Sequence, residues 1–379
     1  MAANQGSRER ASGTLRFLDR YLGIPMVSAL GMARSKRTSL PKIRTIGMLK
    51  TAGIGDTVLL AGPLADLRAA FPDARIVLFV GSNNLEAARL LDGASSVVPL
   101  PIRNVPRALS LIRREPVDVM LDFGPWPRIN ALLTVCARAS FTVGFRTSGQ
   151  YRHYGYDAVV DHSRNVHEIE NYRRLIGAIG VRGSHRPVLR PRFEKLDAAW
   201  LGRRFLVFHL WSGGSRADLK LWPIENWARL AEDLTAAGYD IALTGAEFDH
   251  GRNQNLIGDL TIARRNKLFN VAGWPLGRVA SLLSRASLVV SVDTGVMHLA
   301  AALGTPLVAL HGPTSPIRWG PVGPRAVTIE SPVRGGYLNL GWEAPAAPPP
   351  CMESISCETV LDACLNLLGE NGRPQMAQG

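Results

Sequence analysis

Short apolar runs alternate with segments of helical spacing along the chain from position 42 onward. Each run ends in a loop of small and polar residues, and apolar residues then recur with the period of a helix. The runs that predict strands are residues 43–49, 75–80, 117–123, 141–145, 205–211, 240–246, 288–293 and 307–312. Continuous apolar strands separated by helices are typical of a parallel sheet that is covered on both faces.

The segments between these runs predict the helices. They are residues 57–71, 126–138, 223–238, 276–286, 295–304 and 354–370. Pro63 lies inside the first of them, and a kink is expected there because proline cannot donate a backbone hydrogen bond. The segment 223–238 begins with a proline and ends with a glycine, as helices commonly do.

The alternation is interrupted once, and this divides the chain into two predicted domains. Residues 182–204 contain Pro187, Pro191 and many charged residues, a composition typical of a linker. We therefore expect two doubly wound α/β domains, over residues 42–190 and 191–350, with a cleft between them. A length of 379 residues agrees with two domains.

Positive charge is concentrated in the first half of the chain. The net charge is +13, residues 1–50 contain 10 Lys/Arg against 2 Asp/Glu, and residues 191–379 contain 17 of each. This asymmetry indicates an anionic partner on one side of the molecule, or simply a solvated basic face with a basic tail. The four cysteines show no metal-binding or disulfide spacing, so we interpret them as free thiols of a reducing compartment.

Residues 1–41 precede the first predicted strand and form a basic N-terminal arm. Within it, residues 21–33 carry no charge, and the cations Arg34, Lys36 and Arg37 follow. The uncharged stretch is too short to span a bilayer. Three interpretations stay open: an anchor at the membrane interface over residues 14–37, a helix packed on the domain, or a cleaved signal peptide.

Two loops at predicted strand ends contain groups suited to sugar-nucleotide chemistry. In GIGD, Gly53 and Gly55 permit a close backbone approach, and Asp56 follows as a carboxylate or as the N-cap of the next helix. In SGGSRADLK, the backbone around Ser212 and Ser215 could hold phosphate oxygens, and Lys220 adds a positive charge. Each loop taken alone could equally be an ordinary cap or polar loop.

Two further strand ends lie in the predicted C-terminal domain. Glu247 directly follows a strand, where it could accept hydrogen bonds from a ribose or simply begin a helix. At the start of the helix after residue 292, the amide groups could face a diphosphate. The candidate residues there are Asp293, Thr294, Gly295 and His298. His298 could also be an ordinary buried histidine.

Several catalytic patterns are missing from the sequence. It contains no DxD tripeptide, no HExxH, no GxSxG and no cysteine–histidine ligand spacing. These absences argue against metal-dependent hydrolysis and against a serine nucleophile, so no metal ligand is assigned.

Taken together, the loops resemble those of glycosyltransferase family 9, the ADP-heptose:lipopolysaccharide heptosyltransferases. The similar stretches are residues 50–76, 165–181, 219–247, 271–316 and 351–360, and DTGVMHLAAALGTP is the most specific of them. The resemblance implies an α/β GT-B fold, with two Rossmann-like doubly wound domains facing across a cleft. It also implies that a terminal segment over residues 351–379 crosses back to the N-terminal domain.

The resemblance further implies a role for each loop. Asp56 looks like the general base, with Gly53 and Gly55 in the acceptor-side loop. Ser212, Ser215 and Lys220 look like diphosphate ligands, and Glu247 looks like the ribose contact. The remaining donor-site residues would be Asp293, Thr294, Gly295 and His298.

By this resemblance the protein is an inverting, metal-independent glycosyltransferase without a cofactor. It would move a sugar, heptose from ADP-heptose, onto an anionic lipopolysaccharide-core acceptor, without a nucleic-acid partner. Its expected place is cytoplasmic, peripheral on the inner face of the inner membrane. Two alternatives remain: a sugar-nucleotide epimerase or donor hydrolase on the same fold, and a non-catalytic binder of anionic glycolipid at the membrane surface.

Overall fold

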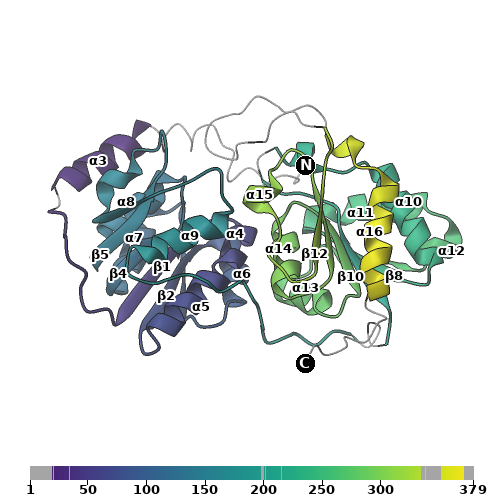
Figure 1. Cartoon of the computed structure of the whole chain (residues 1–379), viewed down its shortest axis with the longest axis horizontal. Helices are drawn as coiled ribbons and strands as arrows, with labels where there is room; N and C mark the ends of the chain where they lie inside the picture. Colours follow the sequence, from purple (N-terminus) through teal and green to yellow (C-terminus); the bar gives the residue numbers. More distant parts are fainter. Residues whose placement is uncertain are drawn as a thin grey trace. The chain divides into compact units, whose positions relative to one another are not determined.

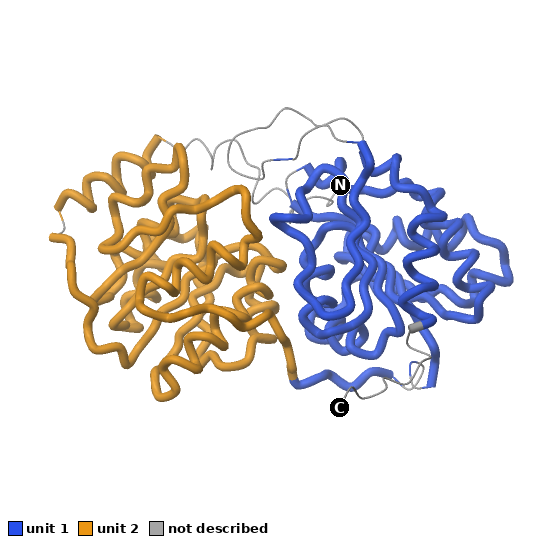
Figure 2. Tube along the Cα trace, viewed as in Figure 1, with its two compact units in different colours: residues 1–7, 192–379 blue, residues 8–191 orange. Residues whose placement is uncertain are grey.

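The computed structural model describes residues 19, 21–33, 35–197, 200, 202–214, 216–333, 338 and 351–370. The described residues form two compact units that divide between Pro191 and Arg192 (Figure 2). Each unit is built around its own parallel sheet, and each is described by itself. The prediction of two doubly wound α/β sheets is confirmed.

A six-stranded parallel sheet with the order β3-β2-β1-β4-β5-β6 forms the centre of the N-terminal unit. The strands are β1 (Thr45–Lys50), β2 (Arg75–Gly81), β3 (Ser96–Leu100), β4 (Val117–Asp122), β5 (Ala139–Arg146) and β6 (Ala158–Asp161). The helices are α4 (Ile54–Leu59), α5 (Ala61–Ala70), α6 (Leu85–Arg89), α7 (Val105–Arg114), α8 (Arg128–Cys136) and α9 (Glu168–Gly177) (Figure 1). The strand order reverses direction between β1 and β4, which is where sheets of this topology bind ligands.

Pro63 divides the predicted helix over 57–71 into α4 and α5. The helix breaks after Leu59, the residue whose carbonyl oxygen a helical residue 63 would use as its acceptor. A proline at 63 lacks the N–H for that bond and its ring crowds the same carbonyl. The sequence predicted a kink, and the structure has a break between two helices instead.

The first described helix, α3 (Gly23–Ala33), packs on the N-terminal unit. Val27 is buried in a small cluster with Ala131 of α8 and Tyr156. Asp19, just ahead of the helix, forms a 2.7 Å ion pair with Arg128 at the start of α8. Of the three interpretations of this segment, packing on the domain is what the described part shows. Residues 1–18, 20 and 34 of the predicted arm lie outside the described residues.

The C-terminal unit repeats the same topology. Its parallel sheet has the order β12-β11-β10-β7-β8-β9, and the direction reverses between β7 and β10. The strands are β7 (Phe205–His209), β8 (Asp240–Thr244), β9 (Leu268–Asn270), β10 (Leu288–Val292), β11 (Leu307–His311) and β12 (Ala326–Glu330). The helices are α10 (Ile224–Ala236), α11 (His250–Asp259), α12 (Ile262–Arg265), α13 (Leu276–Leu283), α14 (Gly295–Ala302), α15 (Pro316–Trp319) and α16 (Cys357–Glu370).

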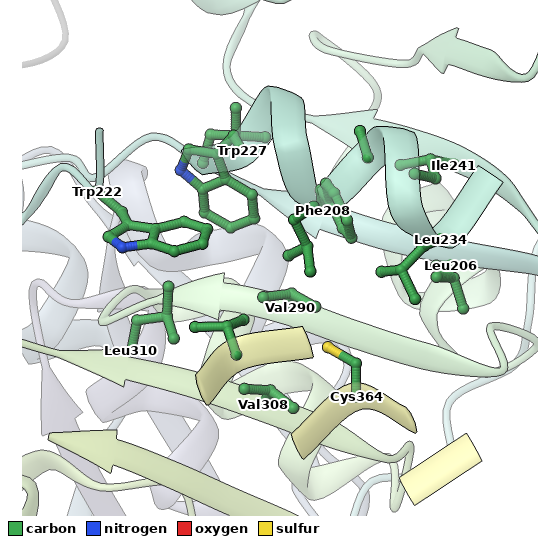
Figure 3. Packing of buried hydrophobic residues seen from close by; sticks show 14 of the residues in the cluster. Leu206, Phe208, Trp222, Trp227, Leu234, Ile241, Val290, Val308, Leu310 and Cys364 are labelled. Carbon is green, nitrogen blue, oxygen red and sulfur yellow. The ribbon is translucent and has the colours of Figure 1, made fainter. Parts of the chain in front are cut away.

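One face of this second sheet carries a large apolar core, where Trp222 and Trp227 pack edge to face beside Phe208 (Figure 3). Cys364 of α16 is buried in the same core, and burial raises the pKa of its thiol to about 12. None of the four cysteines forms a disulfide, as the sequence predicted.

The terminal helix α16 does not follow the prediction that it crosses back to the N-terminal domain. Its apolar side chains Val360, Cys364 and Leu367 are part of the core of the C-terminal unit. The helix lies beside α10 (Figure 1). That expectation, drawn from the resemblance, is wrong for α16 because its buried face is used within its own unit.

Candidate active site

Lys220 and Asp293 form the centre of the polar site in the C-terminal unit. Lys220 ends the short turn Ala217–Lys220 that follows β7, and Asp293 directly follows β10. The Lys220 ammonium lies 3.2 Å from the Asp293 backbone carbonyl and 3.5 Å from its carboxylate. Both side chains are nearly buried. The pair therefore bridges the point where the strand order reverses, as expected for a ligand site of this topology.

Three positive or potentially positive groups surround the Asp293 carboxylate. Burial by itself would raise its pKa, but Lys220, His311 and His298 together lower the pKa to about 2. Burial also lowers the pKa of His311, so its imidazole is neutral near pH 7. Asp293 is thus a permanent anion that holds Lys220 in place, which leaves the lysine charge fixed at the sheet edge.

The helix α14 begins immediately after Asp293. The Thr294 side chain caps it by accepting a hydrogen bond from the Met297 amide at 3.4 Å. Gly295 is its first residue, and His298 is buried one turn further along. A helix N-terminus of this kind carries partial positive charge and suits a phosphate group. The structure therefore brings Asp293, Thr294, Gly295, His298 and Lys220 together.

The loop after β7 takes a backbone path that few residues adopt. Gly214 has φ +92° and Arg216 has φ +55°, so the chain turns through the left-handed region twice before Lys220. Ser212 precedes this turn and is half-buried, and its hydroxyl contacts only the neighbouring Gly213 carbonyl, at 3.4 Å, among the hydrogen bonds described. The predicted diphosphate ligand Ser215 lies outside the described residues.

Glu247 lies at the end of the adjacent strand β8, exposed and in the first turn Glu247–Asp249. The acid that closes this turn is Asp249, whose carboxylate accepts from the Ala246 amide at 2.9 Å. Glu247 is therefore not used as the cap. Its carboxylate lies against Gly273 (φ +87°), where an added Cβ would come within 2.2 Å of it.

In the N-terminal unit, Asp56 lies beside a lysine that sequence analysis did not single out. The Asp56 carboxylate is 3.2 Å from the ammonium of Lys50, the last residue of β1, and its side chain is 24% exposed. Lys50 itself is buried and reaches the Phe123 carbonyl, just after β4, at 3.3 Å. Lys50 therefore reaches from β1 to β4, the two strands between which the strand order reverses. Its ammonium group faces the Asp56 carboxylate.

Asp56 is not the N-cap of its helix. The cap position is Gly53, and Asp56 is the third residue of α4, in the first turn. Gly53 has φ +92°, and a Cβ there would lie 2.4 Å from the Asp56 carboxylate. Gly55 is buried in the same turn. The two glycines thus let the loop close tightly around the carboxylate.

A fully buried polar network is centred on the carboxyl end of β4. The carboxylate of Asp122, at the end of β4, receives hydrogen bonds from Arg152 and, at 2.6 Å, from the Tyr156 hydroxyl. Burial, together with the Asp122 carboxylate, raises the pKa of Tyr156 well above its usual value, and the phenol stays protonated. This network fixes the end of β4 that Lys50 contacts.

Sequence reasoning thus missed Lys50, His311 and Thr314, the last of which hydrogen-bonds Asp293. A usable signal existed for Lys50, because a charged residue ends an apolar strand directly before GIGD. His311 ends β11, and Thr314 lies in the loop after it, where the small residues carry no comparable pattern.

Comparison with known proteins identifies the family of this chain. The profile of glycosyltransferase family 9 (heptosyltransferase) matches residues 128–337, more than half of the chain. The chain belongs to glycosyltransferase family 9. It is accordingly an enzyme of glycosyl transfer, as the motifs indicated.

Two curated relatives show how far the similarity of this family 9 glycosyltransferase extends. Lipopolysaccharide heptosyltransferase 2 of Salmonella typhimurium is 25% identical over 361 residues, which cover 87% of this chain and 99% of the relative. Lipooligosaccharide heptosyltransferase 2 of Haemophilus influenzae is 36% identical over 139 residues, or 36% of this chain and 40% of the relative's length.

Solved structures confirm the GT-B fold. ADP-heptose lipopolysaccharide heptosyltransferase II of E. coli has a TM-score of 0.72 and 22% identity, covering 87% of this chain and all of that one. A family 9 glycosyltransferase of Veillonella parvula has a TM-score of 0.71 and 20% identity, covering 89% and 100%.

Neither a metal-binding cluster nor a membrane-spanning helix is present among the described residues. No group of three or more His, Cys, Asp or Glu side chains in the described ranges is arranged to hold a metal ion. Among the helices of that same part of the chain, none has the length and apolarity needed to cross a membrane.

Proposed function

We propose that this family 9 glycosyltransferase transfers heptose from ADP-heptose to the core of a lipopolysaccharide. Family membership supports glycosyl transfer, and the relatives that match along the chain are named as lipopolysaccharide and lipooligosaccharide heptosyltransferases. The E. coli protein of the same fold is named as an ADP-heptose enzyme. The proposed reaction inverts the anomeric centre and uses neither a metal nor a cofactor.

The C-terminal unit binds the donor in this proposal. Lys220 and the N-terminus of α14, at Thr294 and Gly295, bind the diphosphate, with Ser212 and Ser215 as its further ligands. As the sugar leaves, the ADP oxygen gains negative charge. A fixed ammonium and aligned amide groups stabilise that charge without reorganisation. Asp293 and His298 hold this arrangement, and Glu247 contacts the ribose.

Asp56 of the N-terminal unit is the general base. The acceptor oxygen forms a bond to the anomeric carbon while the bond from that carbon to the ADP oxygen breaks. The hydroxyl proton passes to the Asp56 carboxylate, which is partly exposed and therefore accessible. General-base assistance of this type contributes about 10²–10⁴-fold in rate. Gly53 and Gly55 shape the acceptor-side loop.

The acceptor is anionic and lipid-linked, so the enzyme works at the cytoplasmic side of the inner membrane as a peripheral protein. The charge distribution supports this placement, because residues 1–50 carry 10 Lys/Arg against 2 Asp/Glu. A basic N-terminal half would attract carboxylates and phosphates of a lipopolysaccharide core.

One observation carries the donor assignment: the buried Lys220–Asp293 pair at the reversal point of the second sheet. Titration calorimetry with ADP, UDP and GDP in the presence of EDTA tests it. Selective ADP binding without metal, followed by heptose transfer from ADP-heptose to a lipopolysaccharide core lacking heptose, is expected. A preference for UDP or GDP would discard heptose as the sugar, and loss of transfer in EDTA would contradict the metal-free mechanism.

A further inference from the structure

The outward face of α3 is apolar from end to end. Its exposed residues recur at intervals of three and four, which places them on one side of the helix. They are Pro25, Met26, Ala29, Met32 and Ala33, and the exposed Tyr21 and Leu22 directly precede the helix. Leu22, Met26 and Met32 are 55%, 46% and 83% exposed. A helix lying on a protein in water normally presents charged residues on this side, whereas none of residues 21–33 is charged.

The opposite face of α3 is firmly held. Gly31 lies so close to the Tyr154 carbonyl that an added Cβ would be 2.3 Å from it, and Gly23 lies against Arg128. Val27 is buried, and the Asp19–Arg128 ion pair secures the start of the segment. The apolar outer face is therefore a fixed surface, because α3 packs on α8 (Figure 1). It also packs on the short helix η2 (Arg152–Gly155).

Two exposed tyrosines lie at η2, next to α3. Tyr151 and Tyr154 are 49% and 45% exposed. Tyr151 has φ +55°, a left-handed conformation that is unfavourable for a tyrosine. Tyrosine combines an apolar ring with a polar hydroxyl, and it is enriched where lipid meets water.

Positive charge borders this apolar surface. Lys36 and Arg37 are exposed and follow α3 directly in the chain. Lys36 and Arg146 also help to lower the pKa of His153 of η2, after the larger effect of burial, while Asp161, which pairs with Arg146 at 3.2 Å, opposes them. An apolar face bordered by cations complements a bilayer with anionic headgroups, since the face enters the acyl boundary and the cations meet phosphate.

We propose that the outer face of α3, together with Tyr151 and Tyr154, docks on an anionic lipid bilayer. The docking rests on the proposed function in one respect: a lipid-linked acceptor requires the enzyme to work at a membrane surface. A second copy of the chain is the alternative occupant, and the oligomeric state of the double variant described below tests it.

Sedimentation with vesicles tests the proposal on the full-length protein. Vesicles of phosphatidylethanolamine with phosphatidylglycerol are compared with vesicles of phosphatidylcholine alone. The wild type is expected to sediment with the anionic vesicles and to be released by salt. The double variant Met26→Glu/Met32→Glu should bind at least tenfold more weakly, because it places two charges on the face without touching its buried side.

Ile262→Glu is the matched control, since Ile262 is 76% exposed on a helix of the other unit. It should bind vesicles as the wild type does. Equal binding by the double variant, or no binding by the wild type, would overturn the proposal. So would a wild-type dimer that the double variant converts to a monomer without any loss of vesicle binding.

Transfer to a delipidated, soluble core oligosaccharide separates this proposal from the enzymatic one. The double variant should keep its rate on that acceptor and its thermal unfolding temperature while it loses vesicle binding. A failure of heptose transfer in the wild type would contradict the proposed function and would leave the sedimentation result unchanged.

Discussion

A lysine spans the reversal point of each sheet, but the two lysines hold their aspartates differently. Lys50 contacts the carbonyl after β4 and faces Asp56, whereas Lys220 contacts the carbonyl and the carboxylate of Asp293 after β10. The Asp56 side chain is 24% exposed and the Asp293 side chain is 9% exposed. The accessible carboxylate suits proton transfer, and the enclosed one suits the positioning of a cation.

Replacing Asp56 should separate chemistry from donor binding. Asp56→Asn removes the base and is expected to lower the transfer rate about 10²–10⁴-fold, with ADP affinity changed less than twofold. Steady-state transfer and ADP titration measure the two effects. Asp73→Asn, at an exposed turn position of the same unit, is the control for loss of one negative charge. Full activity in Asp56→Asn would remove the base assignment.

The free energy of unfolding should fall in acid as Asp293 becomes protonated. Its pKa is about 2 in the folded protein, below the usual 3.8, so its contribution is complete above pH 4 and is lost as the pH falls toward 2. The difference corresponds to about 2 kcal/mol. The free energy of unfolding of the wild type should therefore fall by about this amount more than that of Asp293→Asn between pH 5 and pH 2. Parallel losses in chemical denaturation would show that the carboxylate is not held by its cations.

At the scale of elements, the loop from β1 into α4 depends on one backbone conformation. Gly53 combines φ +92° with a position against the Asp56 carboxylate. An alanine there would have both an unfavourable φ and a Cβ 2.4 Å from that carboxylate. The short helix α4 can therefore present Asp56 only because its N-cap has no side chain.

Gly53→Ala should lower both stability and activity. The left-handed φ costs about 1–2 kcal/mol, and moving Asp56 should reduce transfer at least tenfold. Urea unfolding and transfer kinetics measure these effects. Gly177→Ala is the matched control, because Gly177 belongs to α9 and an added Cβ there meets nothing within 4 Å. If both variants behaved alike, the conformational argument would be refuted.

Edge strands mark the limit of what periodicity predicted. The four strands absent from the sequence prediction are β3, β6, β9 and β12, and each lies at the edge of its sheet. An edge strand is covered on fewer sides, so it need not be continuously apolar. All residues of β12 are exposed or half-buried, and β9 has only three residues. The central strands were predicted because both of their faces are buried.

At the scale of the whole molecule, the two units have the same strand order but different net charges. Lys and Arg exceed Asp and Glu only before residue 191, while the proposed nucleotide site lies in the electrically neutral half. Tryptophan is distributed in the opposite sense, because seven of the eight lie beyond residue 191. Tryptophan fluorescence therefore reports mainly on the C-terminal unit.

ADP should stabilise the unit that tryptophan fluorescence follows. At about 100 times its dissociation constant, a ligand that binds only the folded state adds about 2.7 kcal/mol, or about 5–10 °C in the unfolding midpoint. Lys220→Met should abolish most of this shift, whereas the exposed-site control Lys195→Met should keep it. A full shift in Lys220→Met would remove this lysine from the diphosphate site.

Local sequence determined the secondary structure of the central strands, the division near residue 190 and the small-residue loops at the strand ends. These features follow from short-range rules of burial, period and turn chemistry, which act within one element. The loops GIGD and SVDTG were therefore recognisable before any contact was known.

Only the tertiary structure decided which polar groups come into contact. Lys50 and Phe123 are 73 positions apart, as are Lys220 and Asp293, and no local rule brings either pair together. The parallel register places the ends of β1 and β4, and those of β7 and β10, at the same sheet edge. The apolar face of α16 is evident from the sequence. Only the tertiary structure shows that this face packs in the core of the C-terminal unit. Burial at these junctions then fixes the low pKa of Asp293, because desolvation and neighbouring charges depend on distance in space and not on distance along the chain.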